Sequence, residues 1–399
     1  MTVSTAIPQI TSETEAILAA ERFAESISDG AIDRDRTGRL PRRELAAFDA
    51  SGLLAITIPA QDGGADLPIG TLSEVVRRIA AVDPAIAQGP QAHFLMIDVL
   101  AVHGTATQRR RLFAEALDGG RIGNALAERG GQHAQDLRTR LHGGQRLEGQ
   151  KYYCTGALTA RWIAVSALDE SDQLVLAFVP LDAEGVELDE DWNVMGQRAT
   201  VSGGARFTDV AVDPELVVAY QDAFAVPQQL GARAQLFHAA IQVGIAGGAL
   251  RDARDFVRER ARPFFEATRG GWAQNAGQDP HVIQRFGRLA TQVRTAELML
   301  ADAAAIQDRV GRRPADAEAA ARGSIAVAQA KALASEVAVA VSSDLFALSG
   351  ASAADERYDL SRHWRNARTH ASHDPVDWKY HHTGNFLLNE VFPPNHGQL

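Results

Sequence analysis

Cysteine and lysine are scarce in this chain of 399 residues, and each scarcity excludes a class of protein. Cys154 is the single cysteine, so neither an intrachain disulfide nor a CxxC zinc or iron–sulfur site can form. Secreted disulfide-rich domains are thereby excluded, and we expect a cytoplasmic protein. Lysine occurs only at positions 151, 331 and 379 and never follows glycine, which excludes the GxxxxGK phosphate loop of P-loop proteins.

Several other signals are missing as well. The sequence has no GxGxxG, HExxH or GxSxG motif, which removes the simplest signatures of dinucleotide-binding enzymes, zinc proteases and esterases. Its first residues, MTVSTAIPQITSETE, lack the basic and apolar segments of a signal peptide, and no apolar run of about 18 residues predicts a membrane-spanning helix. A net charge of −10 is a poor match for nucleic acid or an anionic membrane, so we expect neither as a partner.

The residues that are present predict three successive parts. Residues 1–120 show helical spacing of apolar side chains together with helix-start signals. We expect helices from Ser12 to Gly30, Pro41 to Gly52, Thr71 (as the cap) to Val82, Pro84 to Gly104 and Thr107 to Gly119. Residues 121–223 contain short apolar runs separated by glycines and acidic turns, which predict an antiparallel sheet or small barrel. These runs are 147–153, 162–167, 174–181 and 205–212.

Residues 224–399 return to helical spacing. Three long helices are expected over 226–262, 280–310 and 314–349. A shorter helix is expected around residues 365–373 and is interrupted by Pro375. The order of helices, then strands, then a helical bundle is typical of an α+β fold rather than an alternating α/β fold.

Histidines gather near the end of the chain. Five of the twelve fall within twenty residues: His363, His370, His373, His381 and His382. In a helix, His370 and His373 share one face, Arg365 and Arg368 lie on a neighbouring face, and Asp374 follows directly. Three interpretations are open: an ordinary polar helix, a metal site, and a site that binds an anion or transfers a proton. We favour the third, because the spacing matches no metal motif and arginine is suited to holding an oxyanion.

Two further segments could carry chemistry. KYYCTG (151–156) ends a strand with small polar groups, and Trp192 lies just before MGQRATVSG (195–203). A planar ligand could stack on Trp192 while hydroxyls bond its polar edge, but a core tryptophan with ordinary turns is the simpler interpretation. His93 lies among apolar residues, where a lone histidine is usually a satisfied core residue. Cys154 has no evident activating base, so we expect it to be structural.

Longer strings resemble a known family. The order of the parts and MGQRATVSGGARFTDVAV (195–212) resemble the acyl-CoA dehydrogenase superfamily over essentially the whole chain. HWRNARTHASHDPVDWKYHHTGNFLLN (363–389) resembles its reduced-flavin monooxygenase branch, which includes dibenzothiophene monooxygenases and, more similar still, sulfur-acquisition enzymes such as methanesulfinate monooxygenases. The resemblance implies an N-terminal helical domain (1–120), a central antiparallel β domain (121–223) and a C-terminal four-helix bundle with the histidine-rich tail (224–399). It also implies a homotetramer with the flavin between the β domain and the bundle.

The resemblance assigns catalytic roles residue by residue. His370 and His373 match the paired active-site histidines of the branch, and Thr155 falls where a serine lies near the flavin. Asn124, His93 and Trp192 match its other pocket residues. A hydrogen-bond donor near the flavin and a histidine that moves a proton would serve oxygen transfer to sulfur.

The resemblance also implies cofactor contacts. Thr155, Trp192, Thr200 and Ser202 match residues at the flavin, and Arg262 matches an arginine that holds the FMN phosphate from a neighbouring subunit. We add Arg368 as an anion-binding candidate. Ser352 stands where the branch carries an arginine, so we expect the hold on the flavin tail, or the substrate specificity, to differ. No metal is implied.

The activity implied is that of a two-component monooxygenase. A separate NAD(P)H-dependent FMN reductase would supply FMNH₂, and O₂ would act through a flavin peroxide on a small organosulfur compound. An alkanesulfinate such as methanesulfinate, used in sulfur acquisition, is the favoured substrate, and S-oxygenation of an aromatic thioether of the dibenzothiophene type is an alternative. Two rivals stay open: an acyl-CoA dehydrogenase with FAD and Asp374 as base, and a non-enzymatic or metal-binding helical protein.

Overall fold

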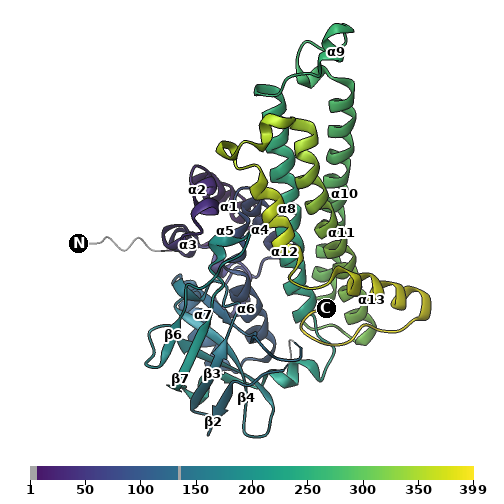
Figure 1. Ribbon diagram of the computed structural model, residues 1–399. Helices are drawn as coiled ribbons and strands as arrows, with labels where there is room; N and C mark the ends of the chain where they lie inside the picture. The colour runs from purple at the N-terminus through teal and green to yellow at the C-terminus, as the bar shows by residue number, and fades with distance from the viewer. Residues whose placement is uncertain (1–6, 134–135) are drawn as a thin grey trace.

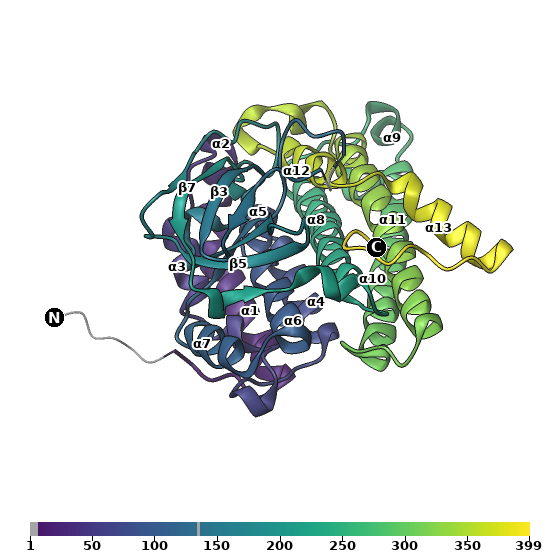
Figure 2. The same ribbon diagram turned by 90° about the horizontal axis from the view of Figure 1, so that it is seen from below.

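The computed structural model describes residues 7–133 and 136–399. Helices come first along the chain, then the strands of a β domain, and then the C-terminal helices (Figure 1). Seven α-helices precede the first strand in the described residues. They are α1 (Glu13–Ser28), α2 (Ala31–Thr37), α3 (Arg42–Asp49), α4 (Ile69–Ala80), α5 (Pro84–Gln88), α6 (Gln91–His103) and α7 (Ala106–Leu117). Figure 2 shows the sheet on one side of the molecule and the long C-terminal helices on the other, with α8 between them.

The N-terminal helices confirm some of the predicted starts and correct others. Ser12 caps α1, since its Oγ accepts a hydrogen bond from the backbone N of Glu15 at 3.3 Å. The predicted cap at Thr71 is wrong, because α4 begins at Ile69 and a carboxylate from another helix, Asp308, accepts from the Ile69 N–H at 2.7 Å. The single helix predicted over residues 84–104 is two helices, because Pro90 lacks an N–H and separates α5 from α6.

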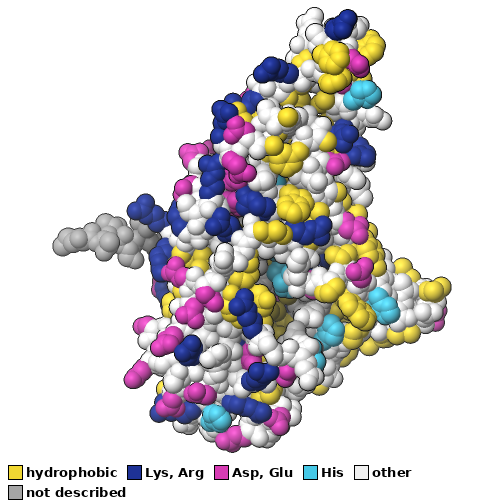
Figure 3. Space-filling view, viewed as in Figure 1, with side chains coloured by type: hydrophobic (Ala, Val, Ile, Leu, Met, Phe, Trp, Pro, Cys, Tyr) yellow, Lys and Arg dark blue, Asp and Glu magenta, His cyan; other side chains and the backbone are white. Residues whose placement is uncertain are grey.

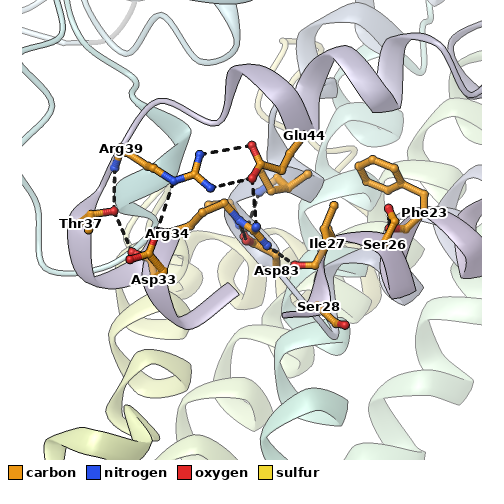
Figure 4. Close-up of polar contacts among 12 residues, drawn as sticks. Phe23, Ser26, Ile27, Ser28, Asp33, Arg34, Thr37, Arg39, Glu44 and Asp83 are labelled. Carbon is orange, nitrogen blue, oxygen red and sulfur yellow. Dashed lines mark hydrogen bonds and ion pairs between the residues drawn. The ribbon is translucent and has the colours of Figure 1, made fainter. Parts of the chain in front are cut away.

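A buried ion-pair cluster fixes the start of α5 (Figure 4). The guanidinium of Arg34 is 2% exposed and donates to Asp83 at 2.7 Å and to Glu44 at 3.2 Å. The other carboxylate oxygen of Asp83 accepts from the N–H groups of Ala85 and Ile86 at 3.1 and 3.2 Å. One aspartate therefore caps α5 and ties it to α2, which sets the position of the residues at the end of α5.

The central sheet has eight strands: β1 (Ile122–Ala125), β2 (Arg140–His142), β3 (Arg146–Lys151), β4 (Trp162–Leu168), β5 (Leu174–Pro180), β6 (Val186–Leu188), β7 (Ala205–Ala211) and β8 (Val217–Val218). Their order is β6-β7-β3-β2-β4-β5-β8, and β1 pairs with β4. The expectation of an antiparallel sheet is corrected at β4, which pairs in parallel with β1 from Ile122 opposite Trp162. The chain between these two strands forms β2 and β3 instead of a crossover helix, so the sheet is mixed and the α+β class is confirmed.

The C-terminal part contains the three long helices α8 (Leu230–Glu259), α10 (Pro280–Val310) and α11 (Ala317–Ser349). Shorter helices α9 (Phe265–Arg269), α12 (Ser361–Ala371) and α13 (Val376–Asn389) accompany them, and Pro375 separates the last two as predicted. Two of the long helices start later than predicted, and in each a preceding side chain accepts from a backbone N–H of the first turn. Gln228 accepts from the Leu230 N–H at 2.5 Å, and Asp316 accepts from the Ala319 N–H at 2.8 Å.

Helix α11 is the centre of this bundle and packs against α8, α10, α12 and α13. By length and composition it is also apolar enough to cross a membrane, although polar residues interrupt its apolar runs. Within its most apolar stretch, 56% of the residues are buried inside the molecule. The hydropathy of α11 therefore fits its place as a core helix.

Candidate active site between the β domain and the C-terminal helices

Three histidines from α8, α12 and the turn after α12 meet near the β domain. Nδ1 of His238 on α8 lies 3.2 Å from Nε2 of His370 on α12. The ring of His373, just beyond the end of α12, packs against the ring of His238 with centroids 4.2 Å apart. His238 and His370 are buried, whereas the side chain of His373 is 41% exposed. Figure 3 shows histidine side chains at a hollow between the β domain and the C-terminal helices.

Gln197 joins the β domain to this cluster. Its backbone N–H donates to Oδ1 of Asn366 on α12 at 2.5 Å. Its side-chain Nε2 lies 3.1 Å from Nδ1 of His370 and donates to Gln88, at the end of α5, at 3.1 Å. Nδ1 of His370 also lies 3.2 Å from Oε1 of Gln88, so this imidazole contacts residues from α5, α8 and the β domain, and its ring orientation is fixed from three sides.

Asp374 links the histidine cluster to two buried lysines. Oδ1 lies 3.3 Å from Nδ1 of His373 and accepts from the buried ammonium of Lys331 on α11. A second buried lysine, Lys379 on α13, lies 2.8 Å from Oδ2. Burial lowers the pKa of Lys331 to about 8 against the opposing pull of Asp374, so this lysine is still largely charged at neutral pH. Two cations and one carboxylate leave an excess of positive charge beside the histidines.

The two buried histidines are neutral at physiological pH. Burial, with the nearby His373 and Lys331, lowers the pKa of His370 to about 3. Burial and the other two rings likewise hold the pKa of His238 well below its ordinary value. Neutral imidazoles both donate and accept hydrogen bonds, so the pair can orient a ligand or pass a proton without carrying a fixed charge.

A row of hydroxyls lies on the β-domain side. Oγ1 of Thr155 lies 2.7 Å from Oγ of Ser202, which in turn donates to Oγ1 of Thr200 at 2.8 Å. Thr200 donates to the carbonyl of Gln197 at 2.8 Å, and the indole N–H of Trp192 donates to the same carbonyl at 3.0 Å. The structure thus brings these four predicted cofactor contacts together and links them through Gln197 to His370.

The backbone is strained where these groups meet. Tyr153, Gln197 and Val201 all have positive φ angles, of 62°, 52° and 42°. Such conformations are costly for residues with a Cβ, most of all for a β-branched one, and in folded proteins they tend to cluster at functional sites. Asn124 adjoins the same turn, since its amide donates to the Tyr153 carbonyl at 3.1 Å and its backbone N–H donates to the Thr155 carbonyl at 3.2 Å.

Two residues expected at the site, His93 and Arg365, make their hydrogen bonds to groups outside the histidine cluster. His93 is completely buried, with Nε2 2.9 Å from the Leu54 carbonyl and Nδ1 accepting from the Ile122 N–H at 3.3 Å. Burial lowers the pKa of His93 to about 4, and the core interpretation of this residue fits its surroundings. Arg365, considered as an anion holder, instead donates to the carboxylates of Asp35 and Asp359 at 2.6 and 2.8 Å.

The other predicted cofactor residues lie on the surface of the single chain. Arg368 on α12 is exposed. Ser352 is exposed in the turn between α11 and α12. Arg262 is exposed between α8 and α9, and Figure 1 shows α9 at the opposite end of the bundle from the β domain. None of the three is in contact with the histidine cluster through a hydrogen bond or ion pair in the described residues.

Sequence reasoning missed His238, Gln197 and the lysines. His238 stands alone in an apolar stretch, which is typical of a core residue. A usable signal was the rarity of lysine: Lys331 lies inside an alanine-rich helix, where a buried ammonium needs a carboxylate partner. Cys154 is buried, and burial raises the pKa of its thiol to about 12, which fits the structural role expected of it. No group of three or more His, Cys, Asp or Glu side chains suited to a metal ion occurs among residues 7–133 and 136–399.

Comparison with known proteins identifies relatives over nearly the whole chain. Residues 11–120 match the model of the acyl-CoA dehydrogenase N-terminal domain, and residues 236–378 match that of the C-terminal domain. A dibenzothiophene monooxygenase of Rhodococcus erythropolis is 32% identical, with 97% of this chain and 96% of the relative covered. The probable FMNH2-dependent monooxygenase SfnC of Pseudomonas putida is also 32% identical, with 95% and 96% covered.

Two solved structures are similar throughout. FMN-bound TdsC from Paenibacillus sp. A11-2 superposes with a TM-score of 0.90 at 29% identity, with 96% of this chain and 100% of that chain covered. The methanesulfinate monooxygenase MsuC from Pseudomonas fluorescens superposes with a TM-score of 0.89 at 31% identity, with 96% and 99% covered.

Proposed function

Because this chain belongs to the acyl-CoA dehydrogenase family, and within it to the flavin-dependent monooxygenases, we propose that it is the oxygenase of a two-component, FMNH₂-dependent system that oxidises a small organosulfur compound. FMN is its flavin, as in its FMN-bound structural neighbour. The observation that carries the proposal is the buried contact of His238 with His370, joined through Gln197 to the hydroxyl row at Thr155.

The residues at the β-domain edge fit an isoalloxazine ring. Thr155, Thr200 and Ser202 offer hydroxyls for its polar edge, and Trp192 offers an aromatic face. Oε1 of Gln197 is buried without a hydrogen-bond partner among the described residues, which leaves a polar atom for a ligand. Reduced FMN, when bound, supplies the two electrons that reduce O₂.

For a sulfinate the overall reaction is RSO₂⁻ + O₂ + FMNH₂ → RSO₃⁻ + FMN + H₂O. The chain binds and orients the reactants and keeps bulk water away from the buried histidines. His370 can hold or give a proton at Nε2, which faces His238, while Gln197 holds its Nδ1. His373 lies at the edge of the cluster, where it can exchange a proton with solvent.

The rival dehydrogenase activity needs a carboxylate that takes an α-proton. Burial alone would raise the pKa of Asp374, but His373, Lys331 and Lys379 hold it well below its ordinary value. A general base works best with a pKa near the operating pH, so a carboxylate fixed by two ammonium groups is poorly suited to that step. This argues for oxygenation over acyl-CoA oxidation.

An alkanesulfinate is the substrate we favour. The excess positive charge of Lys331 and Lys379 over Asp374 favours an anion nearby, and neutral histidines can donate hydrogen bonds to its oxygens. The relative MsuC acts on such a compound according to its name. An aromatic thioether is the second candidate, favoured by the contact of Trp192 with Tyr152 and Tyr153, whose ring centroids lie 6.3 and 6.0 Å from the indole.

The partners follow from the same proposal. A separate NAD(P)H-dependent FMN reductase supplies FMNH₂, and a cytoplasmic location gives it access to the reduced nicotinamide. A homotetramer would bring Arg262 of one subunit to the flavin phosphate of another. Exposed apolar surface supports the tetramer, because a monomer rarely leaves large apolar patches uncovered. The exposed side chains are Phe264, Phe265 and Trp272 near α9, and Trp378, Leu387 and Leu388 on α13.

The test supplies the purified protein with an FMN reductase, NADH, FMN and ¹⁸O₂, and offers methanesulfinate or dibenzothiophene. One ¹⁸O atom per methanesulfonate formed is expected, with little product from dibenzothiophene. Oxidation of acyl-CoA to enoyl-CoA with an artificial electron acceptor, and no ¹⁸O in any sulfur product, would establish the dehydrogenase instead.

A further inference from the structure

The contact between His373 and Asp374 constrains where the imidazole hydrogen lies. Nδ1 of the ring is 3.3 Å from Oδ1 of the carboxylate, and an ionised carboxylate only accepts hydrogen bonds. We infer that Asp374, held by Lys331 and Lys379, is a positioning residue that fixes His373 as the neutral tautomer with hydrogen on Nδ1 and an acceptor lone pair on Nε2.

The two lysines keep the carboxylate in its accepting form. Lys331 donates to Oδ1 of Asp374 and to Oε1 of Gln235, and Lys379 lies 2.8 Å from Oδ2 while it donates to the Gln398 carbonyl. All three charged side chains are buried. A protonated Asp374 could itself donate to Nδ1 and reverse the tautomer, and two adjacent ammonium groups oppose that protonation.

Titratable groups from four helices surround His373, and two of the helices bring a charge. Lys331 lies on α11 and Lys379 on α13, while the neutral rings of His238 and His370 lie on α8 and α12. The cations oppose a second proton on His373, and Asp374 favours it. Packing of the ring among the other groups of the cluster, together with the two cations, lowers the pKa of His373 from its ordinary value against the pull of Asp374. The resting ring is therefore neutral, and the geometry of its contact with Asp374 sets its tautomer.

The catalytic part of this inference rests on the proposed function. In an oxygenase, the acceptor nitrogen of His373 can take up a proton during turnover and return it to solvent, because this ring is the exposed member of the cluster. The tautomer itself is a property of the protein alone and can be measured without flavin.

The first experiment measures the tautomer in the flavin-free, full-length protein labelled with ¹⁵N-histidine. Long-range ¹H–¹⁵N spectra, with His373→Gln used to assign the signal, are expected to show a protonated Nδ1 and a bare Nε2. In Asp374→Asn the amide can donate to Nδ1, so the signal is expected to move to the Nε2-protonated form. A wild-type ring protonated on Nε2, or an Asn variant with the wild-type pattern, would overturn the inference.

The second experiment measures the pH dependence of turnover with the reductase present. Asp374→Asn is expected to lower kcat about a hundredfold or more with KM within about threefold, as when an orienting carboxylate is lost from a histidine. It should move the acid limb to lower pH, whereas Lys331→Met should move it to higher pH, each by about half a unit or more.

Lys151→Met is the matched control, since it also removes a buried lysine, one paired with Glu128 in the β domain, and its acid limb should stay in place. If the acid limb moved in the same direction in the Asp374 and Lys331 variants, or did not move, Asp374 would be a merely structural residue.

If Asp374→Asn does not fold, the NMR spectrum of Lys331→Met decides, because His373 is then expected to keep its hydrogen on Nδ1 but to titrate at higher pH. Absence of any oxygenation by the wild type would sink the proposed function and leave the tautomer measurement intact.

Discussion

The imidazoles of His238 and His373 lie in a tilted stack, with centroids 4.2 Å apart and planes inclined by 32°. One ring comes from the first third of α8 and the other from the turn after α12. Two positive rings at this separation would repel each other, so the stack favours neutral histidines. The cluster is therefore a set of hydrogen-bonding groups, and the fixed positive charge beside it belongs to the lysines.

His238→Phe separates the stack from the hydrogen bond. The variant keeps an aromatic ring against His373 but deletes the nitrogen that bonds Nε2 of His370. Because Nε2 of His370 then lies buried without a partner, we expect a stability loss of about 1–3 kcal/mol and a fall in kcat of about tenfold to a hundredfold. Urea unfolding and steady-state kinetics with an FMN reductase measure the two effects. His238→Ala, which loses the stack as well, should be worse in both, and full activity of the Phe variant would remove the hydrogen bond from the mechanism.

Gly196→Ala tests how the β domain docks on α12. An added Cβ would collide with the carbonyl of Arg365 and lie 2.6 Å from the backbone N of Asn366. The neighbouring Gln197 would be pushed away from His370, so we expect a loss of about 1–3 kcal/mol and a marked fall in turnover. Gly247→Ala on α8 is the control, because a Cβ there meets no atom within 4 Å and alanine favours a helix by up to about 1 kcal/mol. Equal behaviour of the two variants in thermal unfolding would contradict the docking role.

Acid is expected to destabilise the fold through its buried histidines. The folded-state pKa values of His93 and His370 are lowered to about 4 and about 3, from an ordinary value of 6.5. Below pH 6.5 the unfolded chain therefore binds protons that the folded chain does not. The stability linked to these rings is complete above pH 6.5 and is lost as the pH falls towards 4 and 3, at up to about 1.4 kcal/mol per pH unit for each ring.

The comparison of wild type with His93→Gln isolates one of these rings. Urea unfolding at pH 7 and at pH 5 gives the slope of stability against pH for each protein. The variant should be less stable at pH 7, because it disturbs the contacts with Leu54 and Ile122. Its unfolding free energy should fall less steeply with decreasing pH, because the contribution of the His93 ring to that slope is removed. Parallel slopes would show that His93 is charged or exposed in the folded state.

Cys154 should be inert until the protein unfolds. Its side chain is buried and burial raises the pKa of its thiol to about 12, so the thiolate that reacts with disulfide reagents is almost absent at pH 8. We expect no reaction of native protein with an aromatic disulfide reagent over an hour, and reaction of one thiol per chain in urea. Rapid labelling of the native protein would place Cys154 at an accessible surface.

Much of the fold followed from local patterns, and the site followed only in part. Helix spacing and the cap at Ser12 predicted elements whose stability is local, whereas the start of α4 depends on Asp308, which lies far away in sequence. His370 and Thr155 were found through motif resemblance. His238 and Lys331 were not, because each is a single polar residue in an apolar helix, and its partners become visible only when the helices pack.

The position of Arg262 leads to the last prediction, that each active site is shared between two copies of the chain. This arginine is exposed near α9, and in Figure 1 that helix is remote from the β domain that carries Thr155. If it holds the FMN phosphate of a neighbour, Arg262→Ala should weaken FMN binding, measured by flavin fluorescence, by about tenfold or more because a charge-assisted contact is lost. His370→Ala should leave FMN binding nearly unchanged and abolish turnover.

Mixing the two variants, at an FMN concentration too low for Arg262→Ala to bind well, distinguishes a shared site from a site within one chain. In tetramers co-expressed from Arg262→Ala and His370→Ala chains, a shared site is intact whenever one variant supplies His370 and the other supplies Arg262. Random assembly gives this combination at about a quarter of the sites, so about a quarter of wild-type turnover should return. If each chain bound FMN with its own Arg262, no site would hold both residues and the mixture would be no more active than its parents. Recovery with tagged chains, purified through both tags, would therefore establish that the flavin site is built from two subunits.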